Sequence, residues 1–430
     1  MSYLFLLIYL LVFSFLLTRW QWVKDAKIPA FWLLILFLIK VIAGFSLTYL
    51  YTHYYDKSTS DIYIYFNDAH ILKSVFQKDF FLATKILTGF YNEKSELVHQ
   101  ALSNTTYWDT NTSLYAIWGK RLLIRINTLW AFVSFGNIYI HSLLMSFLGF
   151  VGLVALYRFI KNNLAIQRQY LVFIVFLLPT PLLWTSSILK EPLVFLSMGL
   201  LLYHLDKFLR FSYLPNFIYL FFFGFLLFVV KPYILFVLLF PIFLFVLYTY
   251  KRTWSFLTQT KVFALLSLLI VGFVFVLYIS GNYNIFKKIA DKQAAFYENI
   301  TIAEKTKKVG SIISMEKLEP TASSVLKNMP QAFYNVLLKP SILDYKKPTY
   351  LLDILQNLFL IFLSLFAVFR FHRLDRKEYP FVWLTISFVL LLYLLIGLTV
   401  PVLGAIVRYK IPAFIFLMVL LLRLVSKKQI

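Results

Sequence analysis

The chain has 430 residues, of which 61% are hydrophobic, 20% aromatic and only 14% charged. An ordinary soluble domain is excluded, because apolar runs of about 20 residues recur, as membrane-spanning helices require, whereas a β-barrel would show alternating segments of about ten residues. The formal net charge of +23 is explained by Lys and Arg beside membrane spans rather than by nucleic acid, and the lack of cysteine excludes disulfides and thiolate metal sites.

The apolar runs predict an all-α polytopic membrane protein with about 11 transmembrane helices and two extracytoplasmic caps. The predicted spans are, in chain order, 3–18, 29–51, 138–158, 170–186, 188–205, 213–230, 232–250, 262–280, 350–370, 380–399 and 411–425. The first run lacks a basic n-region and a small-residue cleavage site, so it predicts a retained helix rather than a signal peptide.

The spans divide the chain into five segments. These are two N-terminal transmembrane helices in 1–52, a first cap with short helices in 53–137, helices three to eight in 138–280, a second long loop in 281–348, and helices nine to eleven in 349–430. Within the first cap, the stretch 120–135 (KRLLIRINTLWAFVSF) has arginines close to its apolar face. It is therefore either an interfacial or re-entrant helix, or a twelfth span that would change the parity.

Basic residues in the short connections set the expected orientation. They are Arg19, Lys24, Lys27, Arg158, Lys161, Arg168, Lys207, Arg210, Lys251, Arg252, Lys261, Arg370, Arg373, Arg376, Lys377, Arg423, Lys427 and Lys428. With eleven spans all of them fall on one side, which the rule for short loops makes cytoplasmic. We therefore expect a multi-pass protein of the bacterial inner membrane with its N-terminus outside and its C-terminus in the cytoplasm. The second long loop is rich in lysine, but loops longer than about 60 residues are translocated largely regardless of charge.

Several polar residues then share the extracytoplasmic face. Lys190 and Glu191 lie between the fourth and fifth spans, and Lys231 lies between the sixth and seventh. Arg408, Tyr409 and Lys410 lie in the connection before the last span, and Asp61 and Asp68 lie at the start of the first cap. Each has a structural interpretation alone: a polar hairpin tip, a snorkelling cation, a contact with lipid phosphate, or solvated loop acids. Together they place acids above a ring of cations.

That combination suits a lipid-linked phosphate or pyrophosphate, whose anionic head lies at the interface. Lys190, Lys231 and Arg408 would bind the phosphate, while Asp61 or Asp68 would deprotonate an acceptor hydroxyl. Glu191 would orient Lys190, and Tyr409 is a further candidate for substrate binding. A divalent metal is the alternative role for these acids. Seven residues of helix would separate Asp61 from Asp68 by about 10 Å, so their spacing does not support a shared ion. The sequence therefore leaves the cofactor open. The first cap also contains aromatic residues that would either stack on sugar rings or simply pack within the cap. They are Tyr63, Tyr65, Phe66, Trp108 and Trp118.

Three further polar residues lie within predicted spans. Lys40 lies near the middle of the second span, where an ionisable group marks a functional site by default, although a salt bridge to an acid on a neighbouring helix would explain it equally well. His141 and His204 have no second histidine or acid at metal-binding spacing, so we expect neither to bind metal.

The layout resembles the polytopic GT-C glycosyltransferases. IVRYKIPAF (406–414) is similar to a segment found before a late helix in membrane mannosyl- and arabinosyltransferase-like proteins, and PTPLLWTSSILKEPLVFLSMGLLLY (179–203) resembles a segment of bacterial envelope-polysaccharide membrane proteins. The resemblance implies a polyprenyl-phosphate sugar donor and an acid early in the first external loop acting as base or metal ligand, for which Asp61 is the first candidate and Asp68 the second. Two features depart from the family: the first large loop follows the second span, and a paired-acid motif is absent.

Three functions remain open. The first is a membrane glycosyltransferase that moves a sugar from a polyprenyl-phosphate donor to an envelope glycan or lipid. The second is an O-antigen or capsule polymerase acting on lipid pyrophosphate-linked repeats, which needs the cations but no base such as Asp61. The third is a transporter or a membrane subunit of an assembly. A transporter predicts ionisable residues at mid-depth and broken helices in related halves, and Lys40 alone fits.

Overall fold

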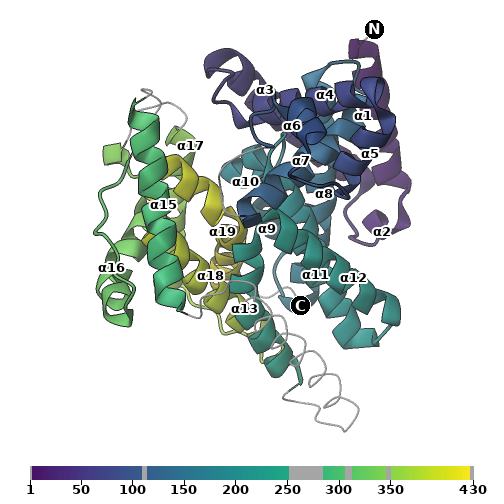
Figure 1. Ribbon diagram of the computed structural model, residues 1–430. Coiled ribbons are helices and arrows are strands. Elements are labelled where there is room, and N and C mark those ends of the chain that lie inside the picture. Colours follow the sequence, from purple (N-terminus) through teal and green to yellow (C-terminus); the bar gives the residue numbers. More distant parts are fainter. Residues whose placement is uncertain (1, 109–113, 251–283, 306–311, 345–349, 427–430) are drawn as a thin grey trace. The chain divides into compact units, whose positions relative to one another are not determined.

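The computed structural model describes residues 2–108, 114–250, 284–305, 312–344 and 350–426 (Figure 1). The described residues are helical, without a strand, and one isolated antiparallel bridge joins Ile312 and Val402. Among them, eight helices are long and apolar enough to cross a membrane. The all-α class and the integral membrane character are therefore confirmed. The chain divides into two compact units, 1–159 with 181–235 (unit 1) and 160–180 with 236–430 (unit 2), and each is described by itself.

Unit 1 contains the predicted first cap and the helices around it. Its helices are α1 (Ser2–Arg19), α2 (Gln21–Lys24), α3 (Ala30–Tyr49) with a π-helical continuation η1 (Leu50–Tyr54), α4 (Asp61–Lys78), α5 (Phe80–Thr88), α6 (Glu96–Leu102), α7 (Leu114–Ala131), most of α8 (Ile138–Asn163), most of α10 (Pro179–Trp184), α11 (Lys190–Phe211) and α12 (Leu214–Val230).

Local sequence sets the ends of the cap helices. Ser60 caps α4 by accepting the Tyr63 N–H, and Asp79 caps α5 by accepting the Leu82 N–H. Gly89 ends α5 in the left-handed conformation (φ 90°), which glycine adopts without steric cost. These helix ends keep α4 and α5 as separate helices. Helix α7 packs along α4.

Unit 2 contains α9 (Arg168–Val172), the π-helical turn η2 (Phe173–Leu177), most of α13 (Pro232–Tyr250), α15 (Ile285–Lys305), α16 (Ala322–Leu338), the 3-10 turn η3 (Ile342–Asp344), α17 (Leu351–Phe369), α18 (Tyr379–Thr399) and α19 (Leu403–Val425). α19 packs against α17 and α18, and α16 packs on α18. At the α16–α18 contact, a β-carbon on Gly397 would overlap the carbonyl oxygen of Ala332.

Two predicted spans differ from the helices that form. The run 170–186 is interrupted: the helix of α9 and η2 ends at Leu177, and a separate helix α10 begins at Pro179. Pro179 lacks an N–H and forces the preceding Leu178 out of helical geometry (ψ 127°). The last span begins at Leu403 rather than 411, because α19 continues through Pro412. Arg408, Tyr409 and Lys410 thus lie inside a helix and not in a connection.

The other predicted spans each coincide with a helix, apart from 262–280, which lies outside the described residues. The number of spans, eleven, stays a prediction. α12 and the 168–177 helix belong to the shorter apolar helices of the described chain. The stretch 120–135 falls largely in α7, which is absent from the spanning candidates and packs on α4, α11 and α12.

Two glycines bring α8 and α11 into backbone contact. A β-carbon on Gly152 would overlap the backbone of Phe195 and Leu196, and one on Gly199 would overlap the carbonyl of Gly152. Membrane helices associate through such small residues, because lipid provides little hydrophobic drive between helices. The close contact holds α11, and with it Lys190, against α8.

We expect Gly199→Ala to lower the unfolding temperature of the detergent-solubilised protein, because the added methyl group must push the two helices apart, at about 1–3 kcal/mol. Gly404→Ala is the matched control, since nothing lies within 4 Å of a β-carbon there. That change should be neutral or slightly stabilising. Equal unfolding temperatures for the two variants would contradict the close packing of α8 and α11.

Candidate functional site

A buried, non-helical segment lies between α10 and α11, directly before Lys190. Residues 185–189 (TSSIL) connect Trp184 to Lys190, and their side chains are fully buried. Buried non-helical backbone requires polar partners from the protein, because an unpaired buried N–H or C=O group is costly. Ser146 Oγ donates to the Ser186 carbonyl at 2.5 Å, and the Thr48 and Ser187 hydroxyls are 2.7 Å apart. The surrounding helices therefore supply the polar partners of this segment, here called the 185–189 break.

Lys40 is the basic residue that contacts the 185–189 break. Its Nζ donates to the Thr185 carbonyl (2.8 Å), the Thr185 hydroxyl (2.6 Å) and the Ser186 hydroxyl (3.1 Å). The residue is 1% exposed, and within the described chain these oxygens, not a carboxylate, are its partners. The salt-bridge interpretation of Lys40 is therefore wrong. Its ammonium instead fixes an unwound segment of the chain.

Just beyond the break, the structure brings two predicted site residues into direct contact. Lys231 Nζ donates to Glu191 Oε1 at 2.7 Å, and both side chains are buried. Glu191 lies in the first turn of α11, where a negative charge is favourable. Lys231 follows the last residue of α12 and precedes Pro232, the first residue of α13. The pair joins the start of α11 to the end of α12.

Lys190, the first residue of α11, lies beside α7. The position of a β-carbon on Gly119 would be 2.9 Å from Lys190 Nζ and 2.6 Å from the Val230 carbonyl oxygen. Gly119 thus leaves room for the Lys190 ammonium where α7 meets the end of α12. The ring of Trp118 packs near Phe228 at the same contact. An ammonium at the carboxyl end of α12 is electrostatically favourable.

The two predicted acids belong to one cluster with Tyr107. The Tyr107 hydroxyl donates to Asp61 Oδ1 at 2.5 Å, and the backbone N–H groups of Thr106 and Tyr107 donate to the two oxygens of Asp68 at 2.9 and 2.8 Å. Lys120 Nζ lies 4.5 Å from the centre of the Tyr107 ring. Sequence reasoning missed Tyr107 and Lys120, since neither stands in a motif.

Burial and charge oppose each other in this cluster. Burial raises the pKa of the Asp68 carboxyl, while the two backbone N–H groups and Lys120 act in the opposite direction. Burial also lowers the pKa of the Lys120 ammonium, and the carboxylates of Asp61 and Asp68 counteract it. Asp68, fully buried with both oxygens bound to backbone, anchors the 106–107 loop.

Helix α7 connects the acid cluster to Lys190. Gly119 and Lys120 are consecutive, so their Cα atoms are about 3.8 Å apart. Gly119 contacts Lys190, and Lys120 faces the Asp61, Tyr107 and Asp68 cluster. Five of the predicted site residues, Asp61, Asp68, Lys190, Glu191 and Lys231, are thus parts of unit 1.

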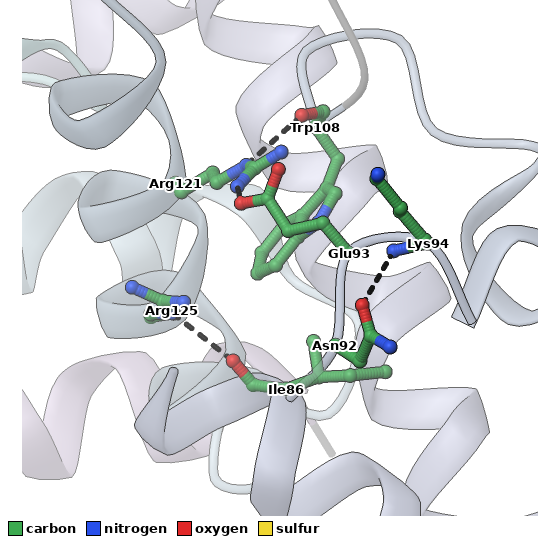
Figure 2. A network of polar contacts seen from close by, with 7 residues as sticks. All are labelled: Ile86, Asn92, Glu93, Lys94, Trp108, Arg121 and Arg125. Carbon is green, nitrogen blue, oxygen red and sulfur yellow. Dashed lines mark hydrogen bonds and ion pairs between the residues drawn. The ribbon is translucent and has the colours of Figure 1, made fainter. Parts of the chain in front are cut away.

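A second network attaches the rest of the cap to α7 (Figure 2). Arg121 donates to the Trp108 carbonyl at 3.1 Å and to Glu93 at 2.5 Å, and Arg125 donates to the Ile86 carbonyl at 3.2 Å. Both guanidinium groups lie over the Trp108 ring, which is 2% exposed. Trp108 is therefore a packed residue rather than an open face for a sugar, and the network fixes the loop that carries Tyr107.

Arg408 and Tyr409 belong to unit 2, where they lie half-buried on α19, and their predicted role in substrate binding stays a prediction. The neighbouring Lys410 is buried, and its Nζ donates to the carbonyls of Val336 (2.9 Å) and Lys339 (3.3 Å) and to Asn357 Oδ1 (3.0 Å). The expectation of a surface lysine at 410 is wrong, because this ammonium caps the end of α16.

Both histidines singled out from the sequence contact an asparagine side chain. His141 lies with its ring centre 5.9 Å from that of His70, and its Nδ1 is 2.9 Å from Asn127 Oδ1. His204 contacts Asn216 at 3.0 Å. In the described ranges no group of three or more His, Asp or Glu residues is arranged to hold a metal ion.

Comparison with protein-family models, with curated proteins and with solved structures gives no significant match. The resemblance to GT-C glycosyltransferases is thus carried by layout and short motifs alone.

We expect Lys231→Met to lower the stability of the protein by about 3–5 kcal/mol, because it leaves the buried Glu191 carboxylate without this ammonium. The double variant Glu191→Leu/Lys231→Met should recover most of the loss, since two apolar side chains of similar volume remove both charges. Thermal unfolding in detergent, followed by tryptophan fluorescence, measures both.

The exposed pair Lys327–Glu316 provides the control for this experiment. Lys327→Met should cost less than about 1 kcal/mol, as solvent-exposed ion pairs do. A Lys231→Met variant no less stable than Lys327→Met would show that the Glu191–Lys231 contact does not stabilise the fold.

Proposed function

We propose that the protein is a membrane glycosyltransferase that transfers a sugar from a polyprenyl-phosphate-linked donor to an envelope glycan or lipid acceptor. The proposal places this reaction on the extracytoplasmic face of the bacterial inner membrane. The observation that carries it is the position of α7, which contacts Lys190 through Gly119 and interacts with Asp61 through Lys120. The Lys120 ammonium also lies over the ring of Tyr107, whose hydroxyl donates to Asp61. A cation suited to phosphate and an acid suited to a hydroxyl thus adjoin one helix.

Asp61 is the proposed general base. It is half-buried at the start of α4, and Tyr107 orients its carboxylate by donating to Oδ1. A carboxylate held in this way could accept the proton of an acceptor hydroxyl as the new glycosidic bond forms. Asp68 has both oxygens bound by backbone N–H groups and serves as a support for Tyr107. The proposal therefore assigns no step to a metal.

Lys190 is the proposed phosphate ligand. Its ammonium would stabilise the negative charge that develops on the phosphate as the sugar leaves. The charge of Lys231 is balanced by Glu191, so this pair is proposed to keep the start of α11 in place rather than to neutralise the donor. Lys120, on α7, adds positive charge near Asp61, the first residue of α4.

Asp61→Asn should abolish formation of the glycan in cells that lack the native copy, with a loss of about 10²–10⁴-fold if a general base is removed. The charge-conserving Asp61→Glu should retain part of the activity. Lys94→Gln, in an exposed part of the cap, is the control and should act as wild type. Full product from the Asp61→Asn variant would overturn the transferase. Loss with Lys190→Gln alone would instead favour the polymerase, which needs the cation and no base.

Purified protein should retain undecaprenyl phosphate in native mass spectrometry more strongly than uncharged undecaprenol. Lys190→Gln should weaken that retention about 10–100-fold, because a hydrogen bond to a charged group contributes about 1.5–3 kcal/mol. The Lys94→Gln variant should bind as wild type does. Equal retention of undecaprenyl phosphate by wild-type and Lys190→Gln protein would exclude Lys190 as the phosphate ligand.

A further inference from the structure

Helix α5 and the turn that follows it expose three aromatic side chains. Phe80, Phe81 and Phe90 are 63%, 78% and 83% exposed. The opposite side of α5 is packed: Ala83 and Ile86 are fully buried, and the Ile86 carbonyl accepts a hydrogen bond from Arg125. A short helix that is anchored on one side and bears several open phenyl rings on the other is a surface prepared for contact.

Basic residues flank these rings. Lys78 and Lys85 are exposed at the two ends of α5, while the nearest acid, Asp79, caps the helix by accepting the Leu82 N–H. Open aromatic residues with lysines beside them are typical of helices that lie in the interface of a bilayer, with phenyl rings among acyl chains and ammonium groups among phosphates. An acidic protein surface would not require the phenyl rings.

Aromatic contacts run from α5 to the membrane-spanning helix α1. The ring centre of Phe76 lies 5.9 Å from that of Phe80 and 5.4 Å from that of Phe132. Just after α7, Phe135 stacks on Phe5 of α1 at 4.1 Å. The hydroxyl of Tyr9 on α1 donates to the Val133 carbonyl at 3.1 Å.

The lipid-facing character of α1 extends this apolar surface. α1 is long and apolar enough to cross a membrane, and Leu17 is its one buried residue among those described. Leu129, Phe132, Val133 and Phe135 remain partly exposed beside its N-terminal half. Exposed apolar side chains thus occur on α1, on the 129–135 stretch that contacts it, and on α5.

We propose that α5, with Phe90, inserts into the headgroup region of an anionic bilayer, in the leaflet beside the N-terminal half of α1. Phe80, Phe81 and Phe90 contact the upper acyl chains, and Lys78 and Lys85 contact lipid phosphates. The inserted helix fixes the height of the cap above the bilayer, because its packed side is attached through Arg125 and Trp108 to the loop of Tyr107. This inference does not depend on the proposed glycosyltransferase activity.

The absence of cysteine from the chain permits a direct test. A nitroxide label on Phe81→Cys, in vesicles of phosphatidylethanolamine and phosphatidylglycerol, should collide more with oxygen than with a water-soluble nickel chelate. A label on Leu11→Cys, on the exposed side of α1, gives the lipid-phase reference, and one on Lys94→Cys gives the aqueous reference. We expect the label at 81 to resemble the label at 11.

Two arms complete the test. In phosphatidylcholine vesicles the label at 81 should become more accessible to nickel, because a zwitterionic bilayer lacks the net negative surface charge that attracts the lysines. With the label at Phe90→Cys, the added change Phe80→Ser/Phe81→Ser should move it into water. A label at 81 as accessible to nickel as the one at 94 overturns the insertion, and so does one shielded from both oxygen and nickel, which indicates a protein contact. Equal depth in both lipids overturns the anionic preference.

Discussion

The ammonium group of Lys40 binds the chain where the helix between Pro179 and Phe211 is interrupted. The 185–189 break lies among packed helices, and its polar groups have no access to water. An unsatisfied buried donor or acceptor costs about 1–3 kcal/mol, so a bare break would favour a continuous helix or an unfolded segment. Lys40 binds three oxygens of Thr185 and Ser186, and Ser146 binds the Ser186 carbonyl. The close approach of Gly149 to the Thr185 carbonyl makes room for this arrangement.

The position of the proposed site follows from the 185–189 break. Because the chain is unwound there, α11 begins anew at Lys190, which places this lysine beside α7 and its neighbour Glu191 beside Lys231. From α7, the ammonium of Lys120 lies over the ring of Tyr107, and the Tyr107 hydroxyl donates to Asp61. The polar residues of unit 1 therefore form a connected series from the interior of the helices to the cap. A phosphate ligand and a base supported in this way would be held rigidly, as group transfer requires.

Much of the fold follows from the sequence, because apolar runs of sufficient length become helices in a membrane protein. The interruption after 177 could have been predicted from Pro179 and Pro181, whose effect on the backbone is local. The start of α19 could not, since Arg408 and Lys410 look like surface residues until the carbonyls of Val336 and Lys339 are placed beside Lys410. Tyr107 likewise gains its meaning from its contact with Asp61, 46 residues away in the chain. Lys120 gains its meaning from its positions beside Tyr107 and Asp61. Pairings of this kind, such as Glu191 with Lys231, depend on tertiary packing that no single segment encodes.

Hydrogen–deuterium exchange of the purified protein measures the role of Lys40 most directly. In the wild-type protein, amides of the 185–189 break should exchange slowly, because the segment is buried and hydrogen-bonded. In Lys40→Met, peptides covering 182–192 should exchange at least about tenfold faster, as a loss of about 1.4 kcal/mol or more implies, while peptides of α18 should be unchanged. Unaltered slow exchange of 182–192 in Lys40→Met would contradict the stabilising role of Lys40, since the 185–189 break would then be stable without its ammonium.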